Sequence, residues 1–199
     1  MRNNTFQGNW TYDIKITEDQ KKYAYWLIQQ HDYGKRGKFD GDPERQYTGK
    51  LAEVVFADVM NLDRPVTTRS DDRGIDFVSP NGGIEKLKFN IDVKATGRVT
   101  PTLMEYSSNI IRSQVEKGLT DVYVFMGINK ETSVAEFIGW IMKKELKPDW
   151  IAAEGSTFTR SNGSSFVFAI DTYLVPNTEL YEFDPLYFWR ALREIGDSI

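Results

Sequence analysis

Cysteine is absent from this chain of 199 residues, and histidine occurs once, at His31. The lack of cysteine excludes disulfides and cysteine–zinc sites. His31 has no obvious carboxylate partner in the sequence, so a cap or surface role is expected for it rather than catalysis. The chain has neither a Gly-x-x-x-x-Gly-Lys-Ser/Thr phosphate loop nor an apolar run of about eighteen residues. With no apolar signal core at the N-terminus, we expect a cytoplasmic protein without a membrane partner.

The composition that remains is that of a globular protein. Hydrophobic residues make up 40% of the chain, which is enough for a sizeable core, and the length predicts one domain over residues 1–199. The net charge of −4 argues against a protein that coats nucleic acid without specificity. It leaves room for a local basic groove beside an acidic site.

Strict alternation from Lys86 to Thr96 predicts a β-strand, because apolar and polar residues exchange with a period of two. Asp92 and Lys94 then lie on one face, about 7 Å apart at their Cα atoms. Two such charges on a strand are also typical of a solvent-facing hairpin with a salt bridge. That structural alternative would be preferred if the pair stood alone.

A second aspartate lies upstream in a shorter run, Ile75 to Val78, that also reads as a strand. The turn residues between the two runs, Ser79 to Gly83, include Asn-Gly and Gly-Gly, which readily adopt positive φ. Two adjacent antiparallel strands would therefore bring Asp76 close to Asp92. The alternation does not fix their register.

A third carboxylate, Glu53, lies in a segment with helical spacing. Asp42 and Pro43 suit an N-cap and first position, although Thr48 could cap a later start, and the helix is expected to continue to about Leu62. Glu53 lies within or beside its apolar stripe. A buried carboxylate needs a partner, which would be a metal ion, a lysine of the site or, in the structural alternative, the neighbouring Lys50.

The order of these residues resembles the PD-(D/E)XK nuclease superfamily, the restriction-endonuclease-like fold. Glu53 matches the first core helix, Asp76 the first acidic position, and Asp92-Val93-Lys94 the Asp-x-Lys triplet. Ile75 stands where the motif often has proline, a departure that the superfamily tolerates. The resemblance covers about residues 47–128. It implies an α/β fold with a mixed central sheet flanked by helices, a core at about 47–142, and specialised segments at about 1–46 and 143–199.

The resemblance also implies a chemistry. Asp76, Asp92, the Val93 backbone carbonyl and Glu53 would bind Mg²⁺, with Mn²⁺ as a substitute, and Lys94 would act on the attacking water or on the developing charge. The expected function is a metal-dependent DNA endonuclease of restriction, phage, recombination or repair systems. The alternatives are a noncatalytic binding or assembly module of the same fold, a nuclease acting on RNA, and a metal-dependent hydrolase unrelated to nucleic acid. A homodimer would supply two sites for cutting both strands.

Basic side chains near these segments are candidates for phosphate contacts. A glycine-containing loop carries three of them, and the others flank the predicted site strands or follow on a helix expected from Glu105 to Lys117. The resemblance implies that this helix could offer a polar residue, Gln114 or Asn109, to the site, although a surface position is the more ordinary expectation for either. The candidates are Lys35, Arg36, Lys38, Arg73, Arg98, Arg112 and Gln114.

The remaining patterns predict the framework. A capping box at Thr17 and Gln20 opens a helix to about Gln30. Asp121 to Ile128 is a nearly continuous apolar run typical of a buried strand. The last predicted elements are a strand paired with it at Val134–Met142, a late strand at Ser165–Val175 and an amphipathic helix at Pro185–Ile195.

Overall fold

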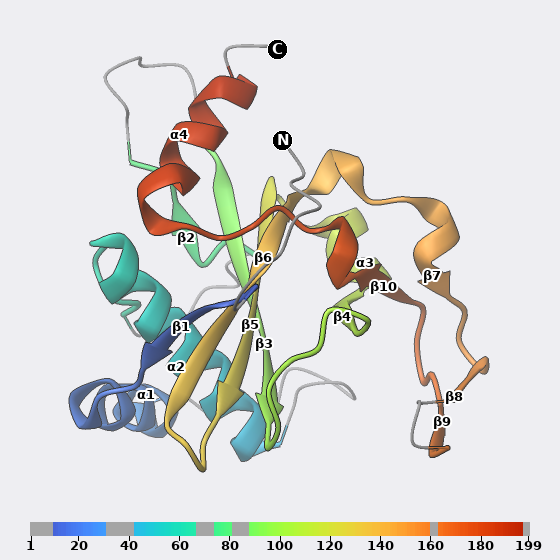
Figure 1. The fold of residues 1–199 in the computed structure, drawn as a ribbon, viewed down its shortest axis with the longest axis horizontal. Helices are drawn as coiled ribbons and strands as arrows, with labels where there is room; N and C mark the ends of the chain where they lie inside the picture. The colour runs from blue at the N-terminus through green and yellow to red at the C-terminus, as the bar shows by residue number, and fades with distance from the viewer. Residues whose placement is uncertain (1–9, 31–41, 67–73, 81–87, 160–162, 197–199) are drawn as a thin grey trace.

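A mixed five-stranded sheet, in the order β1-β6-β5-β3-β2, stands at the centre of the structure (Figure 1). The computed structural model describes residues 10–30, 42–66, 74–80, 88–159 and 163–196. Strands β3 and β5 are parallel, and the other neighbours are antiparallel. The strands are β1 (Tyr12–Lys15), β2 (Phe77–Val78), β3 (Asn90–Arg98), β5 (Val122–Asn129) and β6 (Val134–Met142). The predicted α/β class with a mixed central sheet is confirmed.

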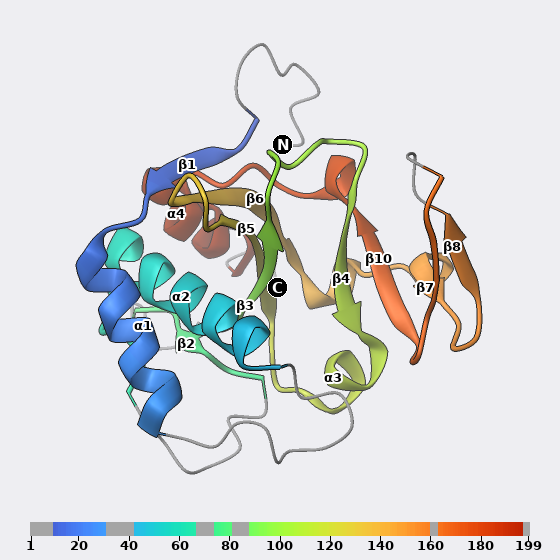
Figure 2. The ribbon, with the colours of Figure 1, turned by 90° about the horizontal axis from the view of Figure 1, so that it is seen from below.

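Two different layers cover the faces of this sheet (Figure 2). Helices α1 (Glu18–Gln30), α2 (Pro43–Met60) and α4 (Pro185–Gly196) lie on one side. The other side carries α3 (Arg112–Lys117) and a three-stranded antiparallel sheet of β4 (Ser107–Ile111), β10 (Thr172–Pro176) and β7 (Ile151–Ala152). A hairpin of β8 (Thr157–Thr159) and β9 (Ser165–Val167) extends beyond that sheet, and 3₁₀ turns occupy Lys143–Glu145, Pro148–Trp150 and Asn177–Glu179.

Strand β5 is buried along all its length because it faces both layers. Val122, Val124 and Met126 belong to the apolar cluster of the α1, α2 and α4 layer. Tyr123 and Phe125 alternate with them and pack with the cluster that holds Ile110 of β4 and Val115 of α3. The run of apolar residues in the sequence is therefore the sign of two buried faces, as predicted.

Helix α2 begins where one of the two predicted starts placed it. The Asp42 side chain accepts a hydrogen bond from the Arg45 amide, at 2.9 Å, and Pro43 occupies the first turn. Thr48 is inside the helix, where its hydroxyl donates to the Glu44 carbonyl at 2.8 Å. The later start at Thr48 is therefore wrong.

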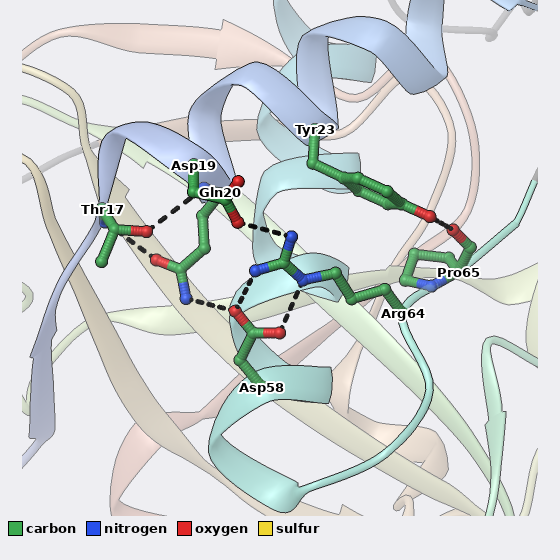
Figure 3. Close-up of polar contacts among 7 residues, drawn as sticks. All are labelled: Thr17, Asp19, Gln20, Tyr23, Asp58, Arg64 and Pro65. Carbon is green, nitrogen blue, oxygen red and sulfur yellow. Dashed lines mark hydrogen bonds and ion pairs between the residues drawn. The ribbon is translucent and has the colours of Figure 1, made fainter.

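A polar network holds α1 against α2 (Figure 3). The predicted capping box is present, with the Thr17 amide donating to Gln20 Oε1 at 2.9 Å. Gln20 Nε2 in turn donates to Asp58 Oδ2 at 2.8 Å. Arg64 contacts Asp58 with two nitrogens, at 2.7 and 2.8 Å, and Asp19 with a third, at 2.7 Å. The hydrogen bonds from Arg64 hold the pKa of the Asp58 carboxyl below its usual value. The carboxylate of α2 therefore remains an acceptor for Gln20 of α1 and for Arg64.

Two predicted elements are wrong in part. Residues 105–117 do not form one helix, because Ser107–Ile111 is strand β4, paired with β10, and only Arg112–Lys117 is helical before Gly118. The predicted strand Ser165–Val175 is two strands, β9 and β10. Pairing between β4 and the distant β10 overrides the local pattern at Ser107–Ile111, whereas β9 pairs with the neighbouring β8.

Other predicted elements are confirmed, including Val134–Met142 as β6 and the final helix as α4. Strand β2 pairs with β3 only at Ile91 and Asn90, and the turn predicted between them lies mostly outside the described residues. No helix among the described residues has the length and apolar character needed to cross a membrane. The division into a core and specialised end segments stays a prediction.

Substitution of Phe56 of α2 tests the apolar cluster between the central sheet and helices α1, α2 and α4. The Phe56 side chain is fully buried and its ring contacts four others, those of Phe77, Phe137, Phe183 and Phe188. We expect Phe56→Ala to lower the free energy of unfolding by about 3–5 kcal/mol, measured by urea denaturation. Phe158→Ala, at a residue 38% exposed on the hairpin, is the control and should cost less than about 1.5 kcal/mol. Equal losses in the two variants would contradict this description of the core.

Candidate active site

Strand β3 presents Asp92 and Lys94 to the side of the sheet that α2 does not cover. Val93 packs in the same apolar cluster as Phe56 of α2. The residue paired with Asp92 across the parallel ladder is Tyr123, which belongs to the opposite cluster. Because side chains alternate along a strand, the predicted shared face of Asp92 and Lys94 is confirmed.

Asp76 reaches the same point of β3 from the segment that leads into β2. Its amide donates to the Ile91 carbonyl at 2.9 Å, and its Oδ2 accepts from the Val93 amide at 2.8 Å. The predicted approach of Asp76 to Asp92 is therefore present. Two hydrogen bonds to the backbone of β3 fix it, one from the Asp76 amide and one to the Asp76 side chain. The register that the sequence left open is set by these bonds and by the pairing of Phe77 with Ile91.

Gly74 lets the chain pass close to Asp92. It has a φ of +77°, and a Cβ there would lie 3.5 Å from Asp92 Oδ2 and 3.1 Å from Thr120 Oγ1. The Thr120 hydroxyl donates to the Gly74 carbonyl. A side chain at position 74 would thus combine an unfavourable left-handed conformation with a crowded contact beside the carboxylate.

Lys94 connects Asp92 to helix α3. Its Nζ is 2.7 Å from Asp92 Oδ2 and donates to Gln114 Oε1 at 3.2 Å. Gln114 thus lies at the site, the option that the sequence made less expected, and it fixes the direction of the ammonium group. The short β4 and the helix that follows it are what carry Gln114 to this position.

The Asp92 carboxyl is under electrostatic strain. Its side chain lies in a residue only 4% exposed, and burial, followed by the charge of Asp76, raises its pKa to about 7. The ammonium of Lys94 acts in the opposite direction without cancelling these effects. A second positive charge at this point would therefore stabilise the ionised form of the pair.

Tyr123 is a neighbour of the site that the sequence did not indicate. It is fully buried, and its hydroxyl makes no hydrogen bond within the described residues. Burial, and then the charge of Asp92, raise the pKa of this hydroxyl. Only its place opposite Asp92 in the strand ladder could have indicated it, and that requires the register of β5.

The donors at this point are the two carboxylates and one backbone carbonyl. The amide and carbonyl of a residue point to the same side of a strand, and the Val93 amide points to Asp76. The Val93 carbonyl is therefore directed to that side of β3 as well. These donors fit Mg²⁺, which binds through one or two carboxylates and keeps several waters.

Glu53 has a different partner. It is buried on α2, and both of its carboxylate oxygens accept from Lys50 Nζ at 2.7 Å. Among the described residues, no three acidic, histidine or cysteine side chains are grouped as a metal site would require. The alternative pairing of Glu53 with Lys50 is thus observed, and a role for Glu53 as a metal ligand stays a prediction.

The candidate phosphate contacts divide into three groups. Lys35, Arg36, Lys38 and Arg73 lie outside the described residues. Arg98 is half-buried with its guanidinium 5.2 Å from the centre of the Tyr106 ring, and burial lowers its pKa. Arg112 forms ion pairs with Glu116 at 2.7 Å and Asp171 at 3.2 Å. Both described arginines thus contact other side chains of the chain itself.

Comparison of the chain with protein-family models, with curated proteins and with solved structures gave no match. The functional argument therefore depends on the geometry of Asp76, Asp92, Lys94 and Gln114 and on the chemistry of those groups.

The raised pKa of Asp92 predicts a pH-dependent loss of stability. The folded protein holds the proton of Asp92 up to about pH 7, whereas the unfolded chain releases it near its usual value of 3.8. The free energy of unfolding should therefore fall as pH rises between these values, by on the order of a few kcal/mol. Asp92→Asn, which cannot ionise, should lose less over the same range.

Urea denaturation at a series of pH values measures this difference. Asp149→Asn, at an exposed aspartate, serves as the control and should follow the wild-type curve. Parallel curves for wild type and Asp92→Asn would show that the carboxyl is not perturbed.

Proposed function

We propose that this protein is a metal-dependent nuclease of the PD-(D/E)XK kind that hydrolyses phosphodiester bonds in DNA. The observation that carries the proposal is that Asp76, from the segment leading into β2, meets Asp92 and Lys94 of β3, with burial raising the pKa of Asp92 to about 7. A structural salt bridge needs one carboxylate and one lysine. The second, adjacent carboxylate adds to burial in raising the pKa of Asp92, and a bound cation would favour the ionised form of the pair.

The site residues would take different roles in the reaction. Asp76, Asp92 and the Val93 carbonyl would hold Mg²⁺, which when bound supplies a more acidic water and a positive charge beside the phosphate. Lys94 would orient the attacking water, take its proton, or neutralise the charge that develops on the phosphate. Gln114 accepts a hydrogen bond from Lys94 and would keep the ammonium aimed at the reacting group.

The proposed polymer substrate follows from the same phosphodiester chemistry. DNA is the proposed polymer, with RNA as the alternative because the reaction at phosphorus would be the same. The net charge of −4 favours a local contact with one stretch of nucleic acid over a broad basic surface. We propose a cytoplasmic location, and a homodimer if both strands of a duplex are cut.

A noncatalytic nucleic-acid-binding or assembly module of the same fold is the second candidate. The observation that favours it is that two described lysines beside these acidic residues already have a carboxylate partner. Lys94 lies 2.7 Å from Asp92 and Lys50 lies 2.7 Å from Glu53. Such internal pairs satisfy the buried charges without a metal.

Activity assays separate the two candidates. With Mg²⁺ or Mn²⁺, we expect cleavage of linear and circular DNA, tested beside single strands and RNA. Asp92→Ala and Lys94→Ala should each lower the rate by about 100-fold or more. Lys147→Ala removes a lysine of similar ion-pair length, 3.0 Å to Glu179, and should leave the rate unchanged. Folded wild-type protein that binds DNA but never cuts it would support the noncatalytic module.

Metal binding tests the ligand set, including Glu53. Calorimetry should detect Mn²⁺ binding to the wild type, and Asp76→Asn and Asp92→Asn should each weaken it by about tenfold or more. Glu53→Gln keeps the size of the side chain while weakening its pairing with Lys50. A loss of affinity in this variant would make Glu53 a ligand, and an unchanged affinity would make it a partner of Lys50 alone. No binding at millimolar Mn²⁺, even with DNA present, would overturn the proposal.

A further inference from the structure

A groove with an unusual lining runs along the outer side of α1 and the start of α2. Its volume is about 480 Å³, and it is open to solvent along one side. Among the described residues, the lining combines three aromatic rings with two lysines and one glutamine and includes no acidic side chain. These residues are Lys21, Lys22, Tyr25, Trp26, Gln29 and Tyr47.

Two of the three aromatic rings of this groove, those of Tyr25 and Trp26, lie outside the core, whereas Tyr47 is half-buried and packs against it. On α1 the buried side chains are Gln20, Ala24 and Leu27, whereas Tyr25 is 58% and Trp26 46% exposed. Two large aromatic residues side by side on the solvent face of a helix contribute little to packing. Clustered exposure of this kind marks an interaction surface more often than isolated apolar residues do.

One of these two rings, that of Trp26, is nevertheless held in place. Trp26 lies 5.4 Å from Tyr23, measured between ring centres, and the Tyr23 hydroxyl donates to the Pro65 carbonyl at 3.1 Å. The Arg64 guanidinium lies 5.1 Å from the centre of the Tyr23 ring and joins the network between α1 and α2 (Figure 3). An aromatic surface that is fixed before binding loses little conformational freedom when a ligand stacks on it.

The charged side chains that line the groove are lysines, and carboxylates lie beside them. Lys21 and Lys22 line it, and Lys130 Nζ lies 5.5 Å from the centre of the Tyr47 ring. Lys21 pairs with Glu18 and Lys130 pairs with Glu44, in both cases with an exposed carboxylate at the rim. Exposed pairs of this type are weak, so phosphates could replace the carboxylates as partners of the lysines.

We propose that this groove binds single-stranded nucleic acid, with bases stacked on Tyr25 and Trp26 and phosphates facing Lys21 and Lys22. Aromatic side chains beside a basic track are how proteins hold single strands without reading their sequence. A duplex offers no free base faces for stacking, except at its ends. Protein-binding surfaces are depleted in lysine at their centres, whereas two lysines line this one.

The groove would act as an anchor at a distance from the reaction. It lies on the helix layer, whereas Asp92 and Lys94 face the opposite side of the sheet. Its loss should therefore weaken binding of the strand and raise KM while kcat stays the same. The inference takes the polymer class from the proposed nuclease function but does not depend on its chemistry, so binding without metal tests it separately.

The experiment uses the full chain in EDTA with a fluorescein-labelled oligonucleotide of about twenty thymidines, since one base per aromatic ring plus a phosphate track needs several nucleotides. Fluorescence anisotropy should show binding that weakens with salt. The double variant Tyr25→Ala/Trp26→Ala should bind about tenfold more weakly or worse. Trp26→Phe keeps a ring face and should retain most of the affinity. The matched control is Tyr187→Ala on α4, at a tyrosine 59% exposed, which should bind as wild type does.

Three outcomes would overturn the inference. The first is no binding by folded wild-type protein, and the second is equal affinity of wild type and the double variant. The third is that size-exclusion chromatography shows a dimer for the wild type and a monomer for the double variant. This result would assign the groove to a second copy of the chain. Because the changed side chains are exposed, the double variant should keep the wild-type unfolding midpoint. If the double variant loses binding while neither protein cleaves DNA with metal, the groove is supported as a binding site for single strands and the nuclease proposal fails.

Discussion

The parallel ladder between β3 and β5 decides which side chains of the sheet reach which layer. Eight residue pairs, from Ile91 with Val122 to Arg98 with Asn129, lock the two strands in one register. A shift by one residue would turn Asp92 and Lys94 toward the apolar side of α2 and would turn Val93 away from it. The burial of two opposite clusters therefore protects the position of the charged pair, since the pair could not move without exposing the core.

Local sequence patterns predict the elements in which buried positions recur at a regular spacing along the chain. Alternation predicts β3, and the unbroken apolar run predicts β5, because each follows from one or two buried faces. Strand β4 escapes such reasoning because Ser107–Ile111 becomes a strand through pairing with β10, whose residues lie more than sixty positions later in the sequence. Short elements of this kind depend on tertiary pairing more than on propensity.

The candidate site shows the same division. A turn between two strands, together with alternation, was enough to predict that Asp76 approaches Asp92. The sequence left the partner of Glu53 open, and the structure pairs it with Lys50, three residues away on the same helix. Gln114 and Tyr123 reach the site only through the packing of α3 and the register of β5, neither of which a single sequence encodes locally.

The brevity of β2 has a consequence for solubility. Beyond Asn90 and Ile91, no described strand pairs with that side of β3, where the Val93 amide donates to the Asp76 side chain instead of to a strand. Exposed edges invite pairing with other chains, and proteins commonly guard them with lysine and other charges. Lys94 and Arg98 both lie on β3, so two positive charges stand beside this edge and would hinder its pairing with another chain. That effect would be the same whether or not the site is catalytic.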